Sequence, residues 1–262
     1  MSFFTDYEKH VSEREKEGVP PLALNAKQTS EICELIRLAG NSSGDEKAQN
    51  ELKFLINLLE NRVNPGVDDA AKIKAEFLGE VIDGLKIDGL DAVCAIKILG
   101  KMLGGYNVEI LVRALKNSND AIAQAVANEL KNIILVHEHF DEIAKLANRN
   151  KFAKEVLASW ANAEWFTHKK PLSECIKAVV FKVPGETNTD DLSPASEAYT
   201  RADIPLHAKA MLVKKMPEGL EVLKELKSLG KSVAYVGDVV GTGSGRKSGI
   251  NSIQWHLGDE IE

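Results

Sequence analysis

The sequence predicts a multidomain protein in which an all-α helical domain is followed by a mixed α/β domain. Apolar residues recur with helical spacing almost without interruption from Asp6 to about His168, whereas alternating β-rich runs begin only after Pro171. A chain of 262 residues also corresponds to about two domains at roughly 150 residues each. We therefore expect a helical domain over residues 1–168 and an α/β domain over residues 169–262.

Seven stretches of the first domain carry an apolar stripe with helical spacing, around residues 32–39, 52–59, 77–82, 92–103, 110–115, 121–136 and 143–163. The joints between them are rich in Gly, Asn, Asp and Pro; one lies at 40–45, and another, at 117–120, supplies a helix N-cap. Helix pairs recur at roughly 30 to 45 residues, the spacing of a HEAT-like solenoid. The repeats share little sequence, so a single compact bundle is the alternative.

The second domain alternates strands and helices. Its β-rich runs are 176–183 and 233–240, and its helical stretches are 206–214, 220–229 and 248–257. Pro184-Gly185 directly follows the first run, and we expect this pair to end the strand. The polar segment 185–195 (GETNTDDLSPA) comes next, and on its own it is typical of any surface loop of turn-forming residues.

The charge balance argues against broad binding to nucleic acid or to an anionic membrane. The net charge is −6, the pI is about 5.6, and neither half of the chain is basic. The sequence contains no apolar run of about 18 residues, and its start has neither the basic nor the apolar region of a signal peptide. We expect a cytoplasmic protein that does not bind a membrane.

Three cysteines, Cys33, Cys94 and Cys175, lie far apart and form no CxxC pair. An odd number of isolated cysteines does not suit a disulfide framework, and their spacing does not suit a metal site. We expect reduced, buried thiols.

A glycine-rich segment, GTGSGRKS at 241–248, lies between the second β-rich run and the last helical stretch. Backbone N–H groups at the start of a helix favour an anion, and Arg246 and Lys247 add positive charge. The segment is not a Walker A loop, because Arg246 stands where that motif needs glycine, and it lacks the last glycine of GxGxxG. Since a planar guanidinium suits a carboxylate, the segment predicts a carboxylate-binding loop.

Ser244 stands two residues before Arg246 in this loop. Neighbouring N–H donors and a cation lower the pKa of a hydroxyl group, which would allow Ser244 to act as a base. A simple turn serine is the ordinary alternative.

Six longer segments carry a resemblance to a known family. In the second domain they are GETNTDDLSPA (185–195), RADIPLHA (201–208) and YVGDVVGTGSGRKS (235–248); in the first they are NRVNPGVD (61–68), GGYN (104–107) and SWANAEWF (159–166). In the order in which they occur along the chain, and over essentially the whole chain, they resemble the bacterial aconitase B family of bifunctional aconitate hydratases and 2-methylisocitrate dehydratases. The resemblance implies an N-terminal HEAT-like domain followed by part of a swivel domain.

The resemblance also implies an activity and roles for individual residues. The family interconverts citrate and isocitrate through cis-aconitate, and its members also form 2-methylisocitrate, with a [4Fe-4S] cluster whose open iron binds the departing hydroxyl. By motif match, Ser244 would be the base that removes the carbon-bound proton. Arg201, Ser244, Gly245 and Arg246 would bind substrate, and Asp190 would be a supporting carboxylate.

Two features depart from the family pattern. The family loop reads Gly-Ser-Ser-Arg, whereas Gly245 stands here in place of the second serine. The family's three cluster cysteines, two of them in a CxxC pair, match none of the three cysteines of this chain, so we expect no metal ligands in it. The chain also stops at Glu262, soon after the helix that follows the loop. We therefore expect an N-terminal fragment that supplies part of the site and is inactive alone.

The alternative function is an interaction module. Solenoids present extended surfaces to partners, and the resemblance implies a homodimer and, when the cluster is lost, binding of messenger RNA. The acidic composition gives the RNA role no support.

Overall fold

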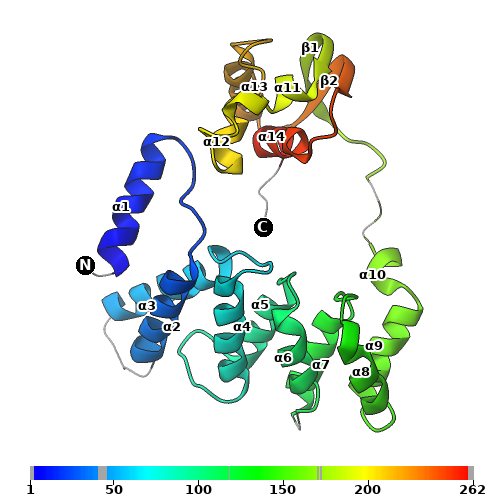
Figure 1. The fold of residues 1–262 in the computed structure, drawn as a ribbon. Helices are drawn as coiled ribbons and strands as arrows, with labels where there is room; N and C mark the ends of the chain where they lie inside the picture. Colours follow the sequence, from blue (N-terminus) through cyan, green and yellow to red (C-terminus); the bar gives the residue numbers. More distant parts are fainter. Residues whose placement is uncertain (1–2, 41–45, 118, 170, 172, 259–262) are drawn as a thin grey trace. The chain divides into compact units, whose positions relative to one another are not determined.

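The structure is a computed structural model that describes residues 3–40, 46–117, 119–169, 171 and 173–258 (Figure 1). Residues 41–45 of the joint expected at 40–45 lie outside the described residues. Two compact units are present: unit 1 comprises Met1–Asp6 and Leu22–Pro171, and unit 2 comprises Tyr7–Pro21 and Leu172–Glu262. Most of the first helix, α1 (Phe3–Lys16), thus belongs with unit 2.

Unit 1 is a succession of helices. They are α2 (Ala26–Gly40), α3 (Glu46–Asn61), α4 (Asp69–Ile82), α5 (Ala92–Gly100), α6 (Tyr106–Ala114), α7 (Asp120–Leu130), the 3-10 helix η1 (His137–His139), α8 (Phe140–Leu146), α9 (Lys151–Ala161) and α10 (Glu164–Thr167). Extensive contacts join helices that are neighbours or next neighbours along the chain, such as α2 with α3 and α4, and α7 with α9. Their apolar stripes meet in a core that includes Ile32, Leu59, Phe77, Leu99 and Leu111.

Short polar side chains cap the N-termini of several of these helices. Asn119 accepts the N–H of Ala121 at 2.9 Å and begins α7, which confirms the helix start predicted at 117–120; Ser118 itself is not among the described residues. Asp68 and Asp91 cap α4 and α5 in the same way. Each cap satisfies N–H groups that have no partner inside the helix.

The apolar stripe predicted over 143–163 is not one helix but two, α8 and α9. Asn150 separates them, because its side chain accepts the N–H groups of Phe152 and Ala153 at 2.9 and 3.0 Å and so begins a new helix. The stripe continues through the break, since both helices bury apolar residues and the two helices contact each other. Spacing alone therefore missed a boundary made by a side-chain hydrogen bond.

Unit 2 contains a parallel pair of strands, β1 (Ala178–Asn188) and β2 (Ser232–Thr242). The connection between them carries α11 (Thr189–Leu192), the 3-10 helix η2 (Ala195–Glu197), α12 (Ile204–Ala208) and α13 (Gly219–Ser228), and α14 (Lys247–Leu257) follows β2. The core of this unit includes Phe181, Val183, Leu192, Met211, Leu212 and Leu223. The described chain is thus mostly helical with one small parallel sheet.

The prediction that Pro184-Gly185 ends the first strand is wrong. β1 continues beyond this pair, because the pairing with β2 shifts register between Val183 and Glu186. Gly185 has a φ of 73°, which favours glycine, and its N–H donates to Asp238 Oδ2 at 2.7 Å. The resulting bulge accommodates a proline that has no N–H to give to the sheet.

The helix predicted over 206–214 also ends early, at Ala208. Leu212 has a left-handed φ of 63°, is fully buried, and donates its N–H to the Asp191 carbonyl oxygen at 2.7 Å. Core packing and this hydrogen bond hold a conformation that a non-glycine residue rarely adopts. The helices predicted at 220–229 and 248–257 are confirmed as α13 and α14.

No helix within the described ranges is both long and apolar enough to span a membrane.

Candidate functional site

The two candidate loops lie at the same end of the sheet. β1 leads directly into α11, and β2 leads through residues 243–246 into α14. Because the strands are parallel, their carboxyl ends meet at one edge, and the register pairs Asn188 with Thr242. The polar segment after β1 and the glycine loop after β2 are therefore neighbours.

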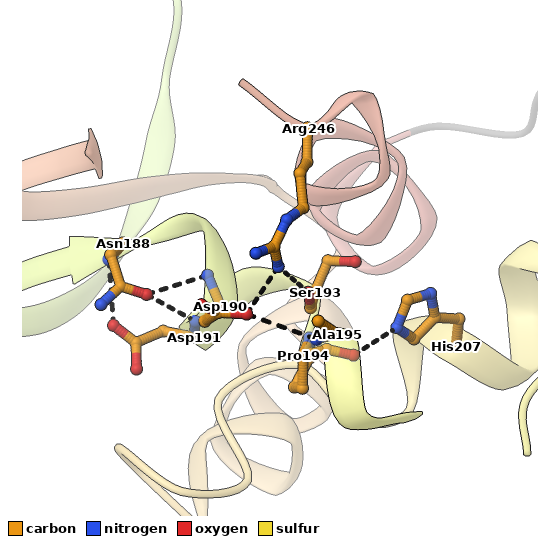
Figure 2. A network of polar contacts seen from close by, with 8 residues as sticks. All are labelled: Asn188, Asp190, Asp191, Ser193, Pro194, Ala195, His207 and Arg246. Atoms are coloured by element: carbon orange, nitrogen blue, oxygen red, sulfur yellow. Dashed lines mark hydrogen bonds and ion pairs between the residues drawn. The ribbon is translucent and has the colours of Figure 1, made fainter. Parts of the chain in front are cut away.

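Asn188 fixes the turn into α11. Its Oδ1 accepts the N–H of Asp190 at 2.8 Å and that of Asp191 at 2.9 Å, and Asp191 Oδ2 accepts the Asn188 N–H at 2.9 Å. This reciprocal capping box supports a helix of four residues, which would be too short to form alone. It occupies the Asp191 carboxylate, while the Asp190 carboxylate contacts Arg246 (Figure 2).

Arg246 reaches from the glycine loop to this turn (Figure 2). Its Nη1 lies 2.5 Å from Asp190 Oδ1 and donates to the Ser193 carbonyl oxygen at 3.2 Å. Arg246, together with the Ala195 N–H, holds the pKa of the Asp190 carboxyl below its usual range. Within the described residues, Arg246 Nε and Nη2 donate to no acceptor, so Asp190 orients a guanidinium that keeps donors for an anion.

Two glycines shape the loop. Gly241 and Gly243 have φ values of 86° and 90°, and a Cβ on Gly243 would lie 3.1 Å from Thr189 Oγ1. The next residue, Ser244, is exposed, and its hydroxyl has no hydrogen-bond partner in the described part of the chain. The loop therefore presents a free hydroxyl two residues before Arg246.

Gly245 departs from the aconitase B pattern. Neither the surrounding space nor the backbone conformation requires a glycine at this position. A Cβ at this position would meet no heavy atom within 4 Å, and its φ is not in the left-handed region. A serine would therefore fit here without displacing a neighbour.

Arg201 is held by residues of its own segment. Its Nε lies 3.0 Å from Glu197 Oε2, and its Nη1 donates to the Leu206 carbonyl oxygen at 3.3 Å. The Arg201 guanidinium lowers the pKa of the Glu197 carboxyl. Arg201 is thus a partly buried cation whose direction is set by two acceptors on either side of it in the sequence.

The structure brings some of the predicted site residues together and keeps one apart. The loop residues 244–246 and Asp190 form one group, joined by the ion pair of Arg246. Among the described contacts, none joins Arg201 directly to this group. The two are connected through neighbouring residues of α12. Arg201 donates to the Leu206 carbonyl oxygen, and Nε2 of the next residue, His207, lies 3.0 Å from the Pro194 carbonyl oxygen, one residue after the Ser193 carbonyl that Arg246 contacts (Figure 2).

Sequence reasoning missed the residues that support this site: Asn188, Glu197 and His207. The signal for two of them was present, because Asn188 and His207 lie inside the segments that resemble aconitase B. Their supporting contacts depend on the turns that bring these segments together, and spacing along the chain does not give those turns.

An apolar hollow of about 410 Å³ lies beside the loop. Its apolar lining comes from Leu192, Val240, Ile250 and Ile253, and Arg246 also contributes to its wall. A ligand held by this arginine would therefore have apolar surface next to it.

The cysteines do not fit an iron–sulfur cluster. Only Cys33 is buried, and burial raises the pKa of its thiol to about 12, which disfavours the thiolate that a metal requires. Cys94 and Cys175 are exposed, so the expectation of buried thiols is wrong for both; Cys94 lies in the first turn of α5 and Cys175 shortly before β1. The described residues contain no group of three or more His, Cys, Asp or Glu side chains that could hold a metal.

The comparisons with known proteins agree with the resemblance of the six sequence segments to the aconitase B family. The family model "Aconitate B N-terminal domain" matches residues 6–166, and "Aconitate hydratase 2 N-terminus" matches residues 178–262. The chain is 52% identical over 260 residues to aconitate hydratase B of Helicobacter pylori, 50% over 256 residues to that of Synechocystis, and 45% over 269 residues to that of Escherichia coli. These alignments cover 99%, 97% and 98% of the chain but only 30%, 29% and 30% of the relatives. The chain spans about 30% of the length of these relatives, and it belongs to the aconitase B family, whose N-terminal domain it carries.

Proposed function

We propose that this chain is the N-terminal part of an aconitate hydratase, a hydro-lyase that interconverts citrate and isocitrate through cis-aconitate, and that it supplies part of the tricarboxylate site. The observation that carries the proposal is Arg246, which Asp190 orients while Nε and Nη2 find no acceptor in the described chain. These two donors suit one substrate carboxylate, and Arg201 binds a second. Its family relatives bear the name aconitate hydratase B.

In this mechanism Ser244 is the base. Its exposed Oγ takes the proton from the substrate carbon next to the carboxylate that Arg246 holds. The positive charge of Arg246 and the N–H groups at the start of α14 stabilise the deprotonated hydroxyl. Asp190 takes no proton, because its pairing with Arg246 keeps it ionised; it positions the guanidinium. The [4Fe-4S] cluster of the family would have its ligands outside the described residues of this chain.

The apolar hollow beside Arg246 supports a second substrate. An added methyl group would have apolar surface next to the carboxylate site, so we include the hydration of 2-methyl-cis-aconitate to 2-methylisocitrate in the proposal.

We further propose that residues 1–168 form a HEAT-like domain and residues 169–262 part of a swivel domain. Packing between neighbouring helices in unit 1 supports the first, and the parallel strands with an anion-binding loop at their carboxyl ends support the second. Residues 7–21 belong with unit 2 in space, so a boundary at 168 separates them from the residues that they contact.

The test of this proposal is kinetic and uses the complete polypeptide that contains this chain, reconstituted with iron and sulfide. Arg246→Lys should lower kcat/KM for citrate by about 100-fold, because the single ammonium group of lysine cannot replace the paired hydrogen bonds of a planar guanidinium. Ser244→Ala should lower kcat by about 100-fold or more with a smaller change in KM. Lys231→Ala, a change outside the site, serves as the control and should leave both constants unchanged. Normal citrate turnover in Arg246→Lys would contradict the proposal.

The 262-residue chain alone should show no citrate turnover after the same treatment. Measurable turnover would overturn the proposal that the chain supplies only part of the site.

A second candidate function is an interaction surface for another copy of the chain. Val67 and Leu103 are 77% and 79% exposed on adjoining loops, which are joined because the Leu103 N–H donates to the Pro65 carbonyl oxygen. Sedimentation of the chain and of Val67→Ser/Leu103→Ser tests this, and a dimer unaffected by the changes would reject this surface. Retardation of RNA at low salt would favour a role in binding messenger RNA instead.

A further inference from the structure

The carboxyl-terminal half of α1 holds the segment that carries Arg201. Arg14 of α1 is buried, and its Nη1 lies 2.8 Å from Asp203 Oδ2. Its Nε donates to the Pro20 carbonyl oxygen at 2.8 Å. Both ends of the guanidinium are therefore engaged, and the Asp203 side chain is only 22% exposed. All these residues belong to unit 2.

The two carboxylate oxygens of Asp203 make different contacts. While Oδ2 pairs with Arg14, Oδ1 accepts the N–H of Leu206 at 2.9 Å and caps α12. A helix of five residues has little stability of its own, so this cap and its partner largely fix where it begins.

A second contact holds the other end of α12. Lys209 donates to the Glu17 carbonyl oxygen at 2.5 Å, and its Nζ lies 3.9 Å from Glu17 Oε2. The segment is thus fixed to the end of α1 both before and after α12. One contact is buried and the other is more exposed, so the Arg14 contact should contribute more.

The position of α12 in turn sets the direction of Arg201. The Leu206 residue whose N–H is capped by Asp203 also offers its carbonyl oxygen to Arg201 Nη1 at 3.3 Å. A continuous path of hydrogen bonds therefore runs from Arg14 through Asp203 and Leu206 to Arg201.

We propose that Arg14 is a positioning residue for Arg201, and that the carboxyl-terminal half of α1 is a working part of the substrate-binding unit. This inference rests on the proposed role of Arg201 in binding a substrate carboxylate. Arg14 touches no substrate; it acts by fixing Asp203.

The first test measures amide hydrogen exchange in the 262-residue chain and does not depend on activity. In Arg14→Ala the amides of residues 206–210 should exchange at least about tenfold faster than in the unchanged chain. Asp203→Asn keeps an N-cap acceptor but removes the charge, and it should give a similar acceleration. Arg14→Ala/Asp203→Asn should add little to either single change, because both remove the same contact.

Lys9→Ala is the matched control on the same helix, since Lys9 and its partner Glu13 are 77% and 59% exposed. It should leave the exchange of 206–210 unchanged. Arg14→Lys keeps the positive charge but not the planar guanidinium. Its exchange rate at residues 206–210 should fall between those of the unchanged chain and Arg14→Ala. This variant also provides a test if the alanine variant folds poorly. Unchanged exchange in Asp203→Asn and Arg14→Lys would overturn the proposal.

The second test uses the complete polypeptide. Arg14→Lys and Asp203→Asn should raise KM for citrate about tenfold while kcat changes less than about threefold, because a binding residue is displaced and the base is not. Arg201→Lys tests the role of Arg201 separately from that of Arg14. If Arg201→Lys leaves KM unchanged, the role of Arg201 is wrong; if it raises KM while the Arg14 and Asp203 variants do not, only the positioning role of Arg14 is wrong.

Discussion

In unit 1 each helix packs on helices that are next to it or one further along the chain, whereas in unit 2 some of the contacts that shape the site join distant residues. Arg246 and Asp190 are 56 positions apart, and Lys209 and Glu17 are 192 positions apart. The first arrangement can form from local contacts, while the second exists only when the chain has closed on itself. Unit 2 should therefore be the more sensitive of the two to a single defect.

The largest expected effect is the loss of a core side chain from unit 2. Phe181 is 1% exposed and packs edge-on against Tyr235, with ring centroids 5.6 Å apart. Phe181→Ala should cost about 3–5 kcal/mol and unfold unit 2 while the helices of unit 1 stay protected. Hydrogen exchange resolved by peptide measures each unit separately. Val180→Ala, at an exposed position on the same strand, is the control. Equal loss of protection in both units would mean that unit 2 is not the more sensitive of the two.

The stability of unit 1 should depend on pH through Lys74. This lysine is 3% exposed, its Nζ donates to the Glu60 carbonyl oxygen at 2.8 Å, and burial lowers its pKa from 10.5 to about 8. Between these values the unfolded chain binds more protons than the folded one, so the free energy of unfolding rises with pH. The buried thiol of Cys33 acts in the opposite direction above about pH 9, because its pKa rises from 9.0 to about 12.

We therefore expect a gain of about 1 kcal/mol between pH 8 and pH 9 in denaturant unfolding of unit 1. Lys74→Met should abolish this gain. In Cys33→Ala the gain should continue toward the ordinary lysine pKa of 10.5. A stability curve of Lys74→Met that rises like that of the unchanged chain would show that another group titrates.

Two helix caps allow a matched comparison of the units. Asn150 and Asn188 each accept two backbone N–H groups, so each change to alanine should cost about 1 kcal/mol of the stability of its own unit. Asn188→Ala should also raise KM for citrate in the complete polypeptide, because it releases the turn that carries Asp190. Asn150→Ala should not. An equal KM change in both variants would mean that stability alone controls the site.

The smallest effect is expected at Gly245. Gly245→Ser should change the free energy of unfolding by less than about 0.5 kcal/mol, since neither neighbours nor φ oppose a side chain there. Gly243→Ser is the contrasting change and should cost about 1 kcal/mol or more, because its φ is 90° and Thr189 Oγ1 lies close. Thermal unfolding of the two variants compares them directly, and equal losses would mean that the loop is held by something other than its backbone.

The sequence predicts most of unit 1 because its helices depend on local spacing and on capping residues such as Asn119. It misses the break at Asn150 and the bulge after Pro184, where one hydrogen bond or one register shift decides the outcome. In the candidate site, residue types alone predict a carboxylate-binding loop and allow Ser244 to act as a base, whereas the role of Arg201 comes only from a resemblance. All three stay predictions. The Arg14–Asp203 contact could not be predicted, because it depends on tertiary closure.

The Arg14–Asp203 pair also bears on how such proteins can exchange parts. A gene recombined once between the helical region and the strands would take Arg14 from one parent and Asp203 from the other. Only parents with arginine and aspartate at these two positions would keep this ion pair in the recombinant protein, unless a second crossover carried residues 7–21 along with the strands. A graft of unit 2 onto another scaffold meets the same requirement. It would have to carry two segments that are separate in the gene, residues 7–21 and residues 172–262.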